Sequence, residues 1–143
     1  ITHQDMTRFN ITLDEGVDMV LNAIENSWGG ELYVPKIPSY RITEIAKAIA
    51  PDCKTELVGI RPGEKIHEEM ITETDAINTY DCGRYYVILP TVPVFKADDW
   101  IKTFKAHAVP EGFKYNSGSN NEWLTVNQIR DLVKAHVDPN FKV

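Results

Sequence analysis

The stretch that decides the fold runs from Thr12 to Pro35 and reads TLDEGVDMVLNAIENSWGGELYVP. Its first part predicts a helix over residues 12–28, because large apolar residues recur at the three- and four-residue spacing of one buried helix face. These residues are Val17, Val20, Leu21, Ile24 and Trp28. A T-x-x-E capping-box pattern opens the helix and a Gly-Gly pair stops it. Residues 31–35 then predict a short strand that ends at a proline.

Helices and strands continue to alternate after this stretch. The sequence predicts a helix over 42–50, a strand over 55–60, a turn over 61–63 and a short helix from Glu64 to about Ile71. Because helix and strand alternate, this half predicts an α/β arrangement in which at least part of the sheet is parallel.

The second half of the chain is less regular. It predicts a strand over 84–89, a short helix over 97–104, a Gly- and Asn-rich loop over 110–121 and a last helix over 125–136, which opens with a second capping box. No repeat, low-complexity segment or linker interrupts the chain. The sequence therefore predicts a single small domain of mixed α/β class over residues 1–143.

Composition limits the function. The 143 residues carry a net charge of −6, whereas proteins that bind nucleic acid usually carry a basic excess, so no nucleic-acid partner is expected. No apolar run reaches the length of a membrane span and no signal peptide is visible, so we expect a cytoplasmic protein whose Cys53 and Cys82 are reduced. Because the chain begins at Ile1 rather than Met, it is expected to be part of a longer protein.

Several catalytic patterns are absent. The four histidines lie far apart in the sequence and predict no metal site, and there is no G-x-S-x-G, Walker A or G-x-G-x-x-G motif. No tyrosine is followed four positions later by lysine, so a Tyr-x-x-x-Lys proton-transfer pair is missing too. We therefore predict no catalytic residue, metal or bound cofactor for this chain alone.

The sharpest local pattern is GIRPGEK at residues 59–65, which ends a locally basic stretch suited to a small anionic ligand. Arg61 follows directly after a predicted strand, and a guanidinium can hold a phosphate through two parallel N–H bonds. Glu64 could accept hydrogen bonds from two neighbouring sugar hydroxyls. A structural interpretation remains open, in which Arg61 is a surface charge and Glu64 favours the dipole of a helix N-terminus.

Further motifs are spread over nearly the whole chain. They are MTRF (6–9), ITL (11–13), GGE (29–31), VPKIPS (34–39), PEGFKYNSG (110–118) and WLTV (123–126). Together with GIRPGEK they resemble the extended short-chain dehydrogenase/reductase superfamily, and within it the inverting UDP-N-acetylglucosamine 4,6-dehydratases of polysaccharide biosynthesis.

The resemblance implies a protein of two parts with separate roles. Members of that family have an N-terminal Rossmann domain, which holds NADP and the catalytic Tyr, Lys and acidic residue, and a smaller C-terminal part that binds the nucleotide sugar. This chain resembles only the C-terminal part. By resemblance, Arg61 would bind the diphosphate and Glu64 the uridine ribose of a UDP-sugar, with Arg8 as a second phosphate contact. Lys36 lies in a family motif and is counted among the substrate-binding residues.

Two functional hypotheses follow. In the first, the chain is the UDP-N-acetylglucosamine-binding part of an NADP-dependent lyase, and it is inactive alone because hydride and proton transfer need the Rossmann domain. In the second, it is an autonomous, non-catalytic assembly module that has kept the fold. Under both hypotheses we expect self-association or pairing with a Rossmann domain, since uncovered apolar surface favours association.

Overall fold

The computed structural model describes residues 1–143 and contains two compact units. The first unit comprises Ile1–Thr12, Ile37–Glu68 and Asn116–Val143, and the second comprises Leu13–Lys36 and Glu69–Tyr115. Each unit is therefore built from segments that are distant in the sequence.

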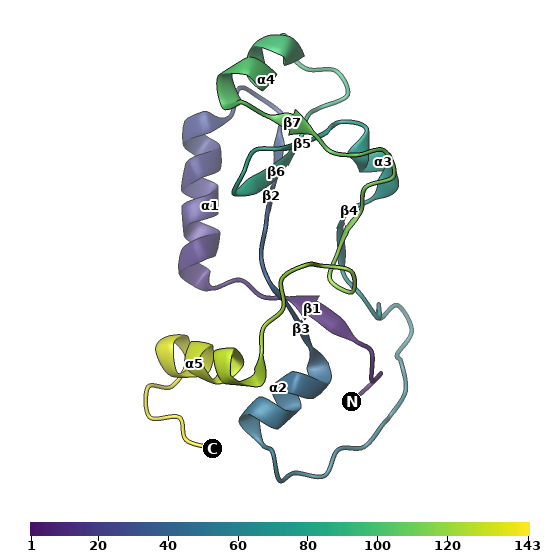
Figure 1. The fold of residues 1–143 in the computed structure, drawn as a ribbon, viewed down its shortest axis with the longest axis vertical. Coiled ribbons are helices and arrows are strands. Elements are labelled where there is room, and N and C mark those ends of the chain that lie inside the picture. Colours follow the sequence, from purple (N-terminus) through teal and green to yellow (C-terminus); the bar gives the residue numbers. More distant parts are fainter. The chain divides into compact units, whose positions relative to one another are not determined.

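A four-stranded sheet organises the second unit (Figure 1). In spatial order its strands are β2 (Leu32–Pro35), β6 (Tyr85–Ile88), β5 (Thr79–Asp81) and β7 (His107–Ala108). Every pairing in it is antiparallel. The predicted parallel component is wrong for this sheet. For β5 and β6 the reason is local, since they are joined by a tight turn in which Gly83 has a φ of 80°. A parallel pair would need a long crossover connection.

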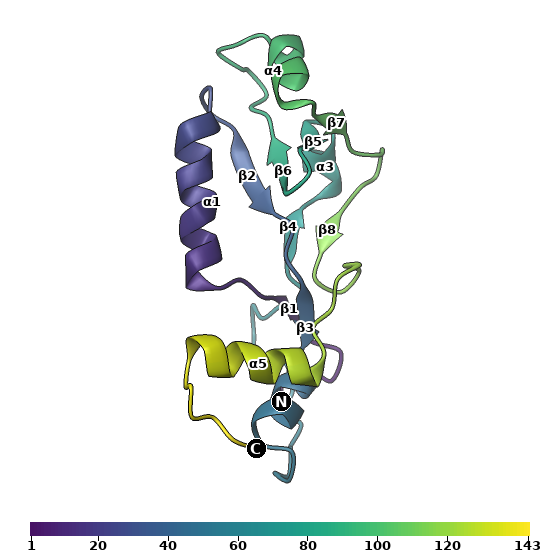
Figure 2. The same cartoon turned by 60° about the vertical axis from the view of Figure 1, so that its left-hand side comes forward.

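Three helices belong to the same unit. They are α1 (Leu13–Asn26), α3 (Glu73–Ala76) and α4 (Ala97–Phe104), and α1 lies along β2 in both Figure 1 and Figure 2. The structure confirms the predicted α4, and it confirms the strands at β2 and β6 within a residue or so of the expected bounds.

The core of this unit centres on Trp100, the buried residue of α4. This residue is 1% exposed and clusters with Val87 and Leu89, and its Nε1–H donates to Glu31 Oε1 at 3.1 Å. Burying a large apolar side chain in this way stabilises a fold by roughly 3 kcal/mol. The hydrogen bond satisfies the one polar atom that the ring carries into the core.

The apolar stripe of α1 does not lie where the sequence predicts it. The helix is confirmed, but Leu13 is 82% exposed and Ile24 is 73% exposed, and Val17, Val20 and Leu21 are exposed as well. Met19 is the α1 residue that packs on the core cluster. The prediction of a buried stripe is wrong because α1 packs on the unit through the face that carries Met19.

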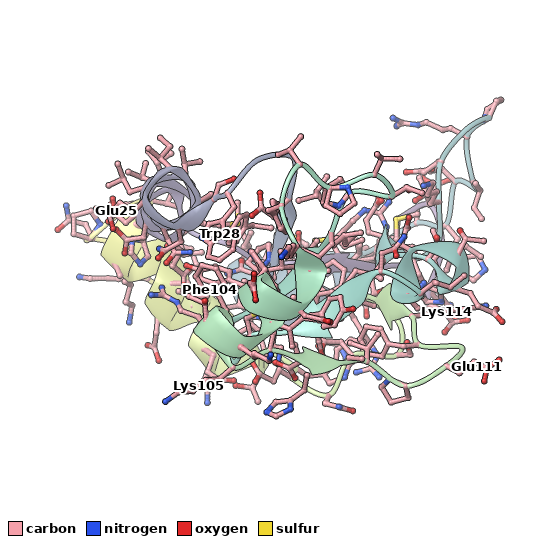
Figure 3. The ribbon with its side chains drawn as sticks, turned by 90° about the horizontal axis from the view of Figure 1, so that it is seen from above. Glu25, Trp28, Phe104, Lys105, Glu111 and Lys114 are labelled. Carbon is pink, nitrogen blue, oxygen red and sulfur yellow. The ribbon has the colours of Figure 1, made fainter.

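Trp28, just beyond α1, is the member of the stripe with ring contacts. It meets the ring of Phe95 edge-on at 5.6 Å and that of Phe104 at 6.0 Å, and Figure 3 shows Trp28 and Phe104 next to each other. These contacts tie the connection between α1 and β2 to the end of α4. Trp28 nevertheless remains 41% exposed.

The first unit pairs two short strands and two helices. β1 (Thr7–Phe9) runs antiparallel to β3 (Ser39–Arg41), which leads directly into α2 (Ile42–Ile49). α5 (Val126–His136) packs against α2, and the predicted capping box at its start is present, with Thr125 and Gln128 exchanging hydrogen bonds. The predicted helices at 42–50 and 125–136 are therefore confirmed, whereas β1 and β3 were not predicted.

The segment after α2 departs most from the sequence predictions. Residues 55–60 form no strand, because their only backbone partner is Ile1, whose amino group donates to the Glu56 carbonyl and whose carbonyl accepts from Val58 N–H. No helix forms over 64–71 either. The Ile66 carbonyl, which a helix would use internally, accepts instead from Thr7 N–H at 3.0 Å.

The remaining elements are short. β4 (Glu69–Ile71) takes the end of the region predicted as a helix, and it forms a two-stranded sheet with β8 (Tyr115–Asn116), inside the predicted loop. No helix has both the length and the apolar character needed to cross a membrane.

Candidate functional site

A reciprocal turn organises the candidate site in the first unit. Glu64 N–H donates to the Arg61 carbonyl at 3.1 Å, and Arg61 N–H donates back to Glu64 Oε2 at 3.1 Å. Gly63 has a φ of 80°, and Pro62 precedes it. Proline followed by a glycine with positive φ is the requirement of a type II turn, which explains why the sequence has Pro-Gly here.

Arg61 offers a guanidinium without a protein partner. The residue is exposed, and only its backbone takes part in the hydrogen bonds of the turn. A guanidinium carries five N–H donors in a planar fork that matches a phosphate or carboxylate. The turn therefore presents a charged donor group to the solvent on a fixed backbone.

Glu64 keeps part of its accepting capacity. One carboxylate oxygen accepts from Arg61 N–H, and the other accepts from the Thr2 hydroxyl at 3.3 Å. A carboxylate has about four acceptor positions, so roughly two remain for a ligand. The predicted helix-dipole role does not apply, because no helix begins at Glu64.

Arg8 is engaged by the protein itself. Its Nη1 donates to the carbonyls of Thr7 at 2.6 Å and Ile66 at 3.1 Å, its Nη2 donates to the Lys65 carbonyl at 2.9 Å, and its Nε lies 3.4 Å from a Glu68 carboxylate oxygen. These bonds hold the residues directly after the turn onto β1. Most of the guanidinium donors are thereby used.

Lys36 lies in the second unit and is also engaged. Its Nζ donates to Asp81 Oδ1 at 2.6 Å and lies 4.4 Å from the centre of the Tyr86 ring. Burial acts to raise the pKa of Asp81, but the hydrogen bonds from Lys36 and Gly83 N–H outweigh it, so this pKa lies below its ordinary value. Lys36 thus fastens the end of β2 to β5.

Three of the four predicted site residues are therefore found in one unit. Arg61 and Glu64 form the turn, and Arg8 holds the next residues, whereas Lys36 belongs to the other unit. Arg61 is the one whose charged group is left without a protein partner.

A second group of polar residues in this unit was missed by the sequence analysis. The Thr7 hydroxyl lies 2.8 Å from His67 Nδ1 and 2.7 Å from Ser117 Oγ, and Glu68 N–H donates to Ser117 Oγ at 2.9 Å. Thr7 and Ser117 are buried, at 3% and 0% exposure. No local pattern signals this cluster, because Thr7 and Ser117 are 110 positions apart.

Metal and dinucleotide sites do not fit this structure. No group of three or more His, Cys, Asp or Glu side chains could hold a metal ion. The sheet of the second unit is antiparallel, so it offers no strand–turn–helix crossover against which the pyrophosphate of NADP could bind. A recess of about 560 Å³ lies beside α2, lined by residues that include Thr43, Lys47 and Cys53, but it contains none of the predicted site residues.

Comparison with known proteins gives a consistent result. A family model described as polysaccharide biosynthesis protein matches residues 1–90. The inverting UDP-N-acetylglucosamine 4,6-dehydratase of Campylobacter jejuni strain 81-176 is 40% identical over 137 residues, which cover 93% of this chain and 41% of that protein. UDP-glucose 4-epimerase of Rickettsia felis is 38% identical over 138 residues, which cover 93% of this chain and 40% of that protein.

One solved structure shares the fold. The X-ray structure of Pen from Bacillus thuringiensis superposes with a TM-score of 0.75 at 20% sequence identity, covering 94% of this chain and 40% of that one. The mixed α/β fold predicted from the sequence is thus confirmed. This chain spans about two fifths of the length of the relatives it matches.

Proposed function

Because this chain belongs to the polysaccharide biosynthesis protein family, we propose that residues 1–143 form the nucleotide-sugar-binding domain of a sugar-nucleotide dehydratase or epimerase. The proposed ligand is UDP-N-acetylglucosamine, and the proposed setting is surface polysaccharide or glycan biosynthesis in the cytoplasm. The names of the Campylobacter and Rickettsia relatives, which both act on UDP-sugars, support this choice of ligand class.

The observation that carries the proposal is the unpartnered guanidinium of Arg61 on its type II turn. A diphosphate needs N–H donors, and the turn offers those of the Arg61 guanidinium from a fixed backbone without breaking an existing contact of that side chain. Glu64, with accepting positions left over, is the proposed partner of the ribose hydroxyls.

Arg8 and Lys36 are proposed to contribute less directly. Direct contact with a phosphate would require Arg8 to give up bonds to the Lys65 and Ile66 carbonyls, and Lys36 to leave Asp81. We therefore assign Arg8 to holding the turn in place. For Lys36 we propose contact with the ligand only if an anionic group of the ligand takes the place of the Asp81 carboxylate.

Catalysis is proposed to need a second domain. The parent reaction uses NADP and a Tyr/Lys pair, and this chain has neither the motifs nor a sheet edge that fits the dinucleotide. NADP, when bound to a separate Rossmann domain, supplies hydride transfer. This chain's residues bind and orient the UDP-sugar. Purified chain alone is expected to release no product from UDP-N-acetylglucosamine; turnover in proportion to its concentration would contradict this.

The exposed face of α1 is the proposed docking surface for that domain. Leu13, Val17, Val20, Leu21 and Ile24 lie outward on it. All charged residues of α1 are acidic, namely Asp14, Glu15, Asp18 and Glu25. Pairing two copies through this face would bring like charges together, so a different partner with basic residues around an apolar patch fits better.

The binding proposal is tested by titrating the chain with UDP and following the Arg61 amide resonance by NMR. Wild-type protein is expected to shift at this residue, and Arg61→Ala is expected to weaken binding at least about tenfold, as for loss of a charged hydrogen bond. Lys54→Ala is the matched control, because it removes the same charge from the same exposed segment. If Arg61→Ala and Lys54→Ala weaken UDP binding equally, the effect comes from the change in net charge and not from contact with Arg61.

The alternative function is a non-catalytic assembly module, which the exposed stripe of α1 also favours. It predicts a stable oligomer and no response to UDP. Light scattering after size exclusion separates the two hypotheses when wild type is compared with Ile24→Gln. An oligomer that Ile24→Gln dissociates, in a protein without a UDP response, would favour the assembly module.

A further inference from the structure

The buried polar cluster of the first unit forms a hydrogen-bond chain in which one direction gives every hydroxyl proton an acceptor. Ser117 Oγ accepts from Glu68 N–H, so its own proton must go to another acceptor. The acceptor within reach is Thr7 Oγ1 at 2.7 Å. Since Ser117 is fully buried, pointing that proton elsewhere would leave a buried donor unsatisfied.

The direction continues to the histidine. When Ser117 donates to Thr7, the Thr7 hydroxyl is free to donate onward, and His67 Nδ1 lies 2.8 Å from it. If Nδ1 donated instead, the proton of the buried Thr7 hydroxyl would have no acceptor in the chain, so we infer that Nδ1 accepts and carries no proton. A neutral imidazole with an unprotonated Nδ1 carries its proton on Nε2. The hydroxyl chain thus selects one tautomer of His67.

We propose that His67, as the neutral Nε2–H tautomer, is a positioning residue that fixes the segment directly after the Arg61–Glu64 turn. The segment Lys65–Glu68 is held on one side by Arg8, through the Lys65 and Ile66 carbonyls, and on the other by this chain. The inference rests on the proposed function, because what it positions is the turn that would bind a UDP-sugar.

A glycine keeps the imidazole in place. A Cβ built on Gly118 would lie 2.6 Å from His67 Nδ1 and 2.7 Å from its Cγ, closer than side chains approach each other. Gly118 N–H in turn donates to Asn116 Oδ1 at 2.7 Å, which fixes the backbone beneath the ring. The imidazole therefore packs against the backbone and is held in place at Nδ1.

Protonation would break the chain. An imidazolium has N–H groups at both nitrogens, so Thr7 would have to accept from Nδ1, and the proton of either Thr7 or Ser117 would then have no acceptor in the chain.

The tautomer can be measured directly. Side-chain ¹H–¹⁵N correlation spectra of the whole chain at about pH 8, where imidazoles are neutral, distinguish a protonated Nε2 from a protonated Nδ1. The expected result is a single Nε2–H form in wild type and a mixture of tautomers in Thr7→Val. A predominant Nδ1–H form in wild type would overturn the proposal.

Two substitutions separate positioning from direct contact. His67→Asn places an acceptor near the Nδ1 position, and His67→Gln places a donor near the Nε2 position. Positioning predicts that Asn preserves slow hydrogen exchange at the Glu68 and Arg61 amides, whereas Gln speeds it about tenfold or more. UDP affinity is expected to follow the same order. The reverse order would mean that Nε2 itself contacts the ligand.

The exchange measurement keeps the outcome independent of ligand binding. If wild type binds no UDP, the proposed function fails, while the exchange rates still decide whether His67 positions the turn. If both variants exchange as wild type does, positioning is wrong even where UDP binds. Gly118→Ala should speed exchange at Glu68, whereas Gly16→Ala, which meets no atom within 4 Å, should not.

Discussion

Arg61 and Glu64 hold each other through two hydrogen bonds of 3.1 Å, one between their backbones and one from the Arg61 N–H to the Glu64 carboxylate. The acid thus keeps its partner's backbone fixed while leaving that partner's guanidinium free. Arg61 and Glu64, which the sequence suggests as two separate ligand contacts, therefore also form one turn.

Replacing Glu64 should therefore affect both stability and binding. Glu64→Ala removes the acceptor of Arg61 N–H, and we expect a loss of about 1 kcal/mol in the free energy of unfolding, as for one hydrogen bond. Glu64→Gln keeps an amide oxygen in reach and should lose less. Urea denaturation measures the first effect, and exchange of the Arg61 amide shows whether the turn has opened. Equal stability of all three proteins would contradict this account.

The turn should also be sensitive to its glycine. Gly63→Ala places a side chain at a φ of 80°, where L-residues are strained, and should destabilise the protein by roughly 1 kcal/mol and weaken UDP binding. Gly16→Ala is the matched control. It lies in the open on α1 and should instead stabilise the helix by about 0.5–1 kcal/mol. Thermal unfolding of both variants tests the contrast.

The Lys36–Asp81 pair should make stability depend on pH. Because the pKa of Asp81 is lowered in the folded protein, its contribution is complete above the ordinary value of 3.8 and is lost as pH falls through the lower folded-state value. The stability gap between wild type and Lys36→Met should therefore shrink on acidification through that range. Lys114→Met, which removes the exposed partner of Glu73, should show a smaller gap throughout.

The two cysteines should react at different rates. Burial, followed by the charge of Asp81, raises the pKa of the Cys82 thiol to about 11, whereas Cys53 is exposed. At about pH 8 iodoacetamide should therefore modify Cys53 first, because the thiolate is the reactive form. Mass spectrometry of wild type and Cys53→Ser measures this. Rapid labelling of Cys82 in folded Cys53→Ser would contradict the raised pKa of its thiol.

Much of the local structure could be predicted, because it depends on neighbouring residues. The capping box at Thr125 and the helix at 97–104 follow from residues within a few positions of each other. The motif of residues 59–65 likewise revealed its turn, since Pro62 and Gly63 dictate the backbone by themselves.

The failures involve long-range partners. A strand over 55–60 was expected from its apolar residues, but it has no neighbouring strand to pair with, and Val58 remains 62% exposed. The helix expected after Glu64 is replaced because Arg8, more than fifty positions earlier, takes the carbonyls of Lys65 and Ile66. Thr7 and Ser117 are 110 positions apart in the sequence, so no local pattern could predict their contact.

The outward stripe of α1 also bears on how long the protein survives in a cell. A folded helix that shows Leu13 and Ile24 to the solvent presents the same kind of surface that chaperones and proteases use to detect unfinished proteins. The lifetime of this chain should therefore rise with the abundance of whatever covers α1. A pulse-chase comparison of wild type with Ile24→Gln would register that dependence as a difference in half-life.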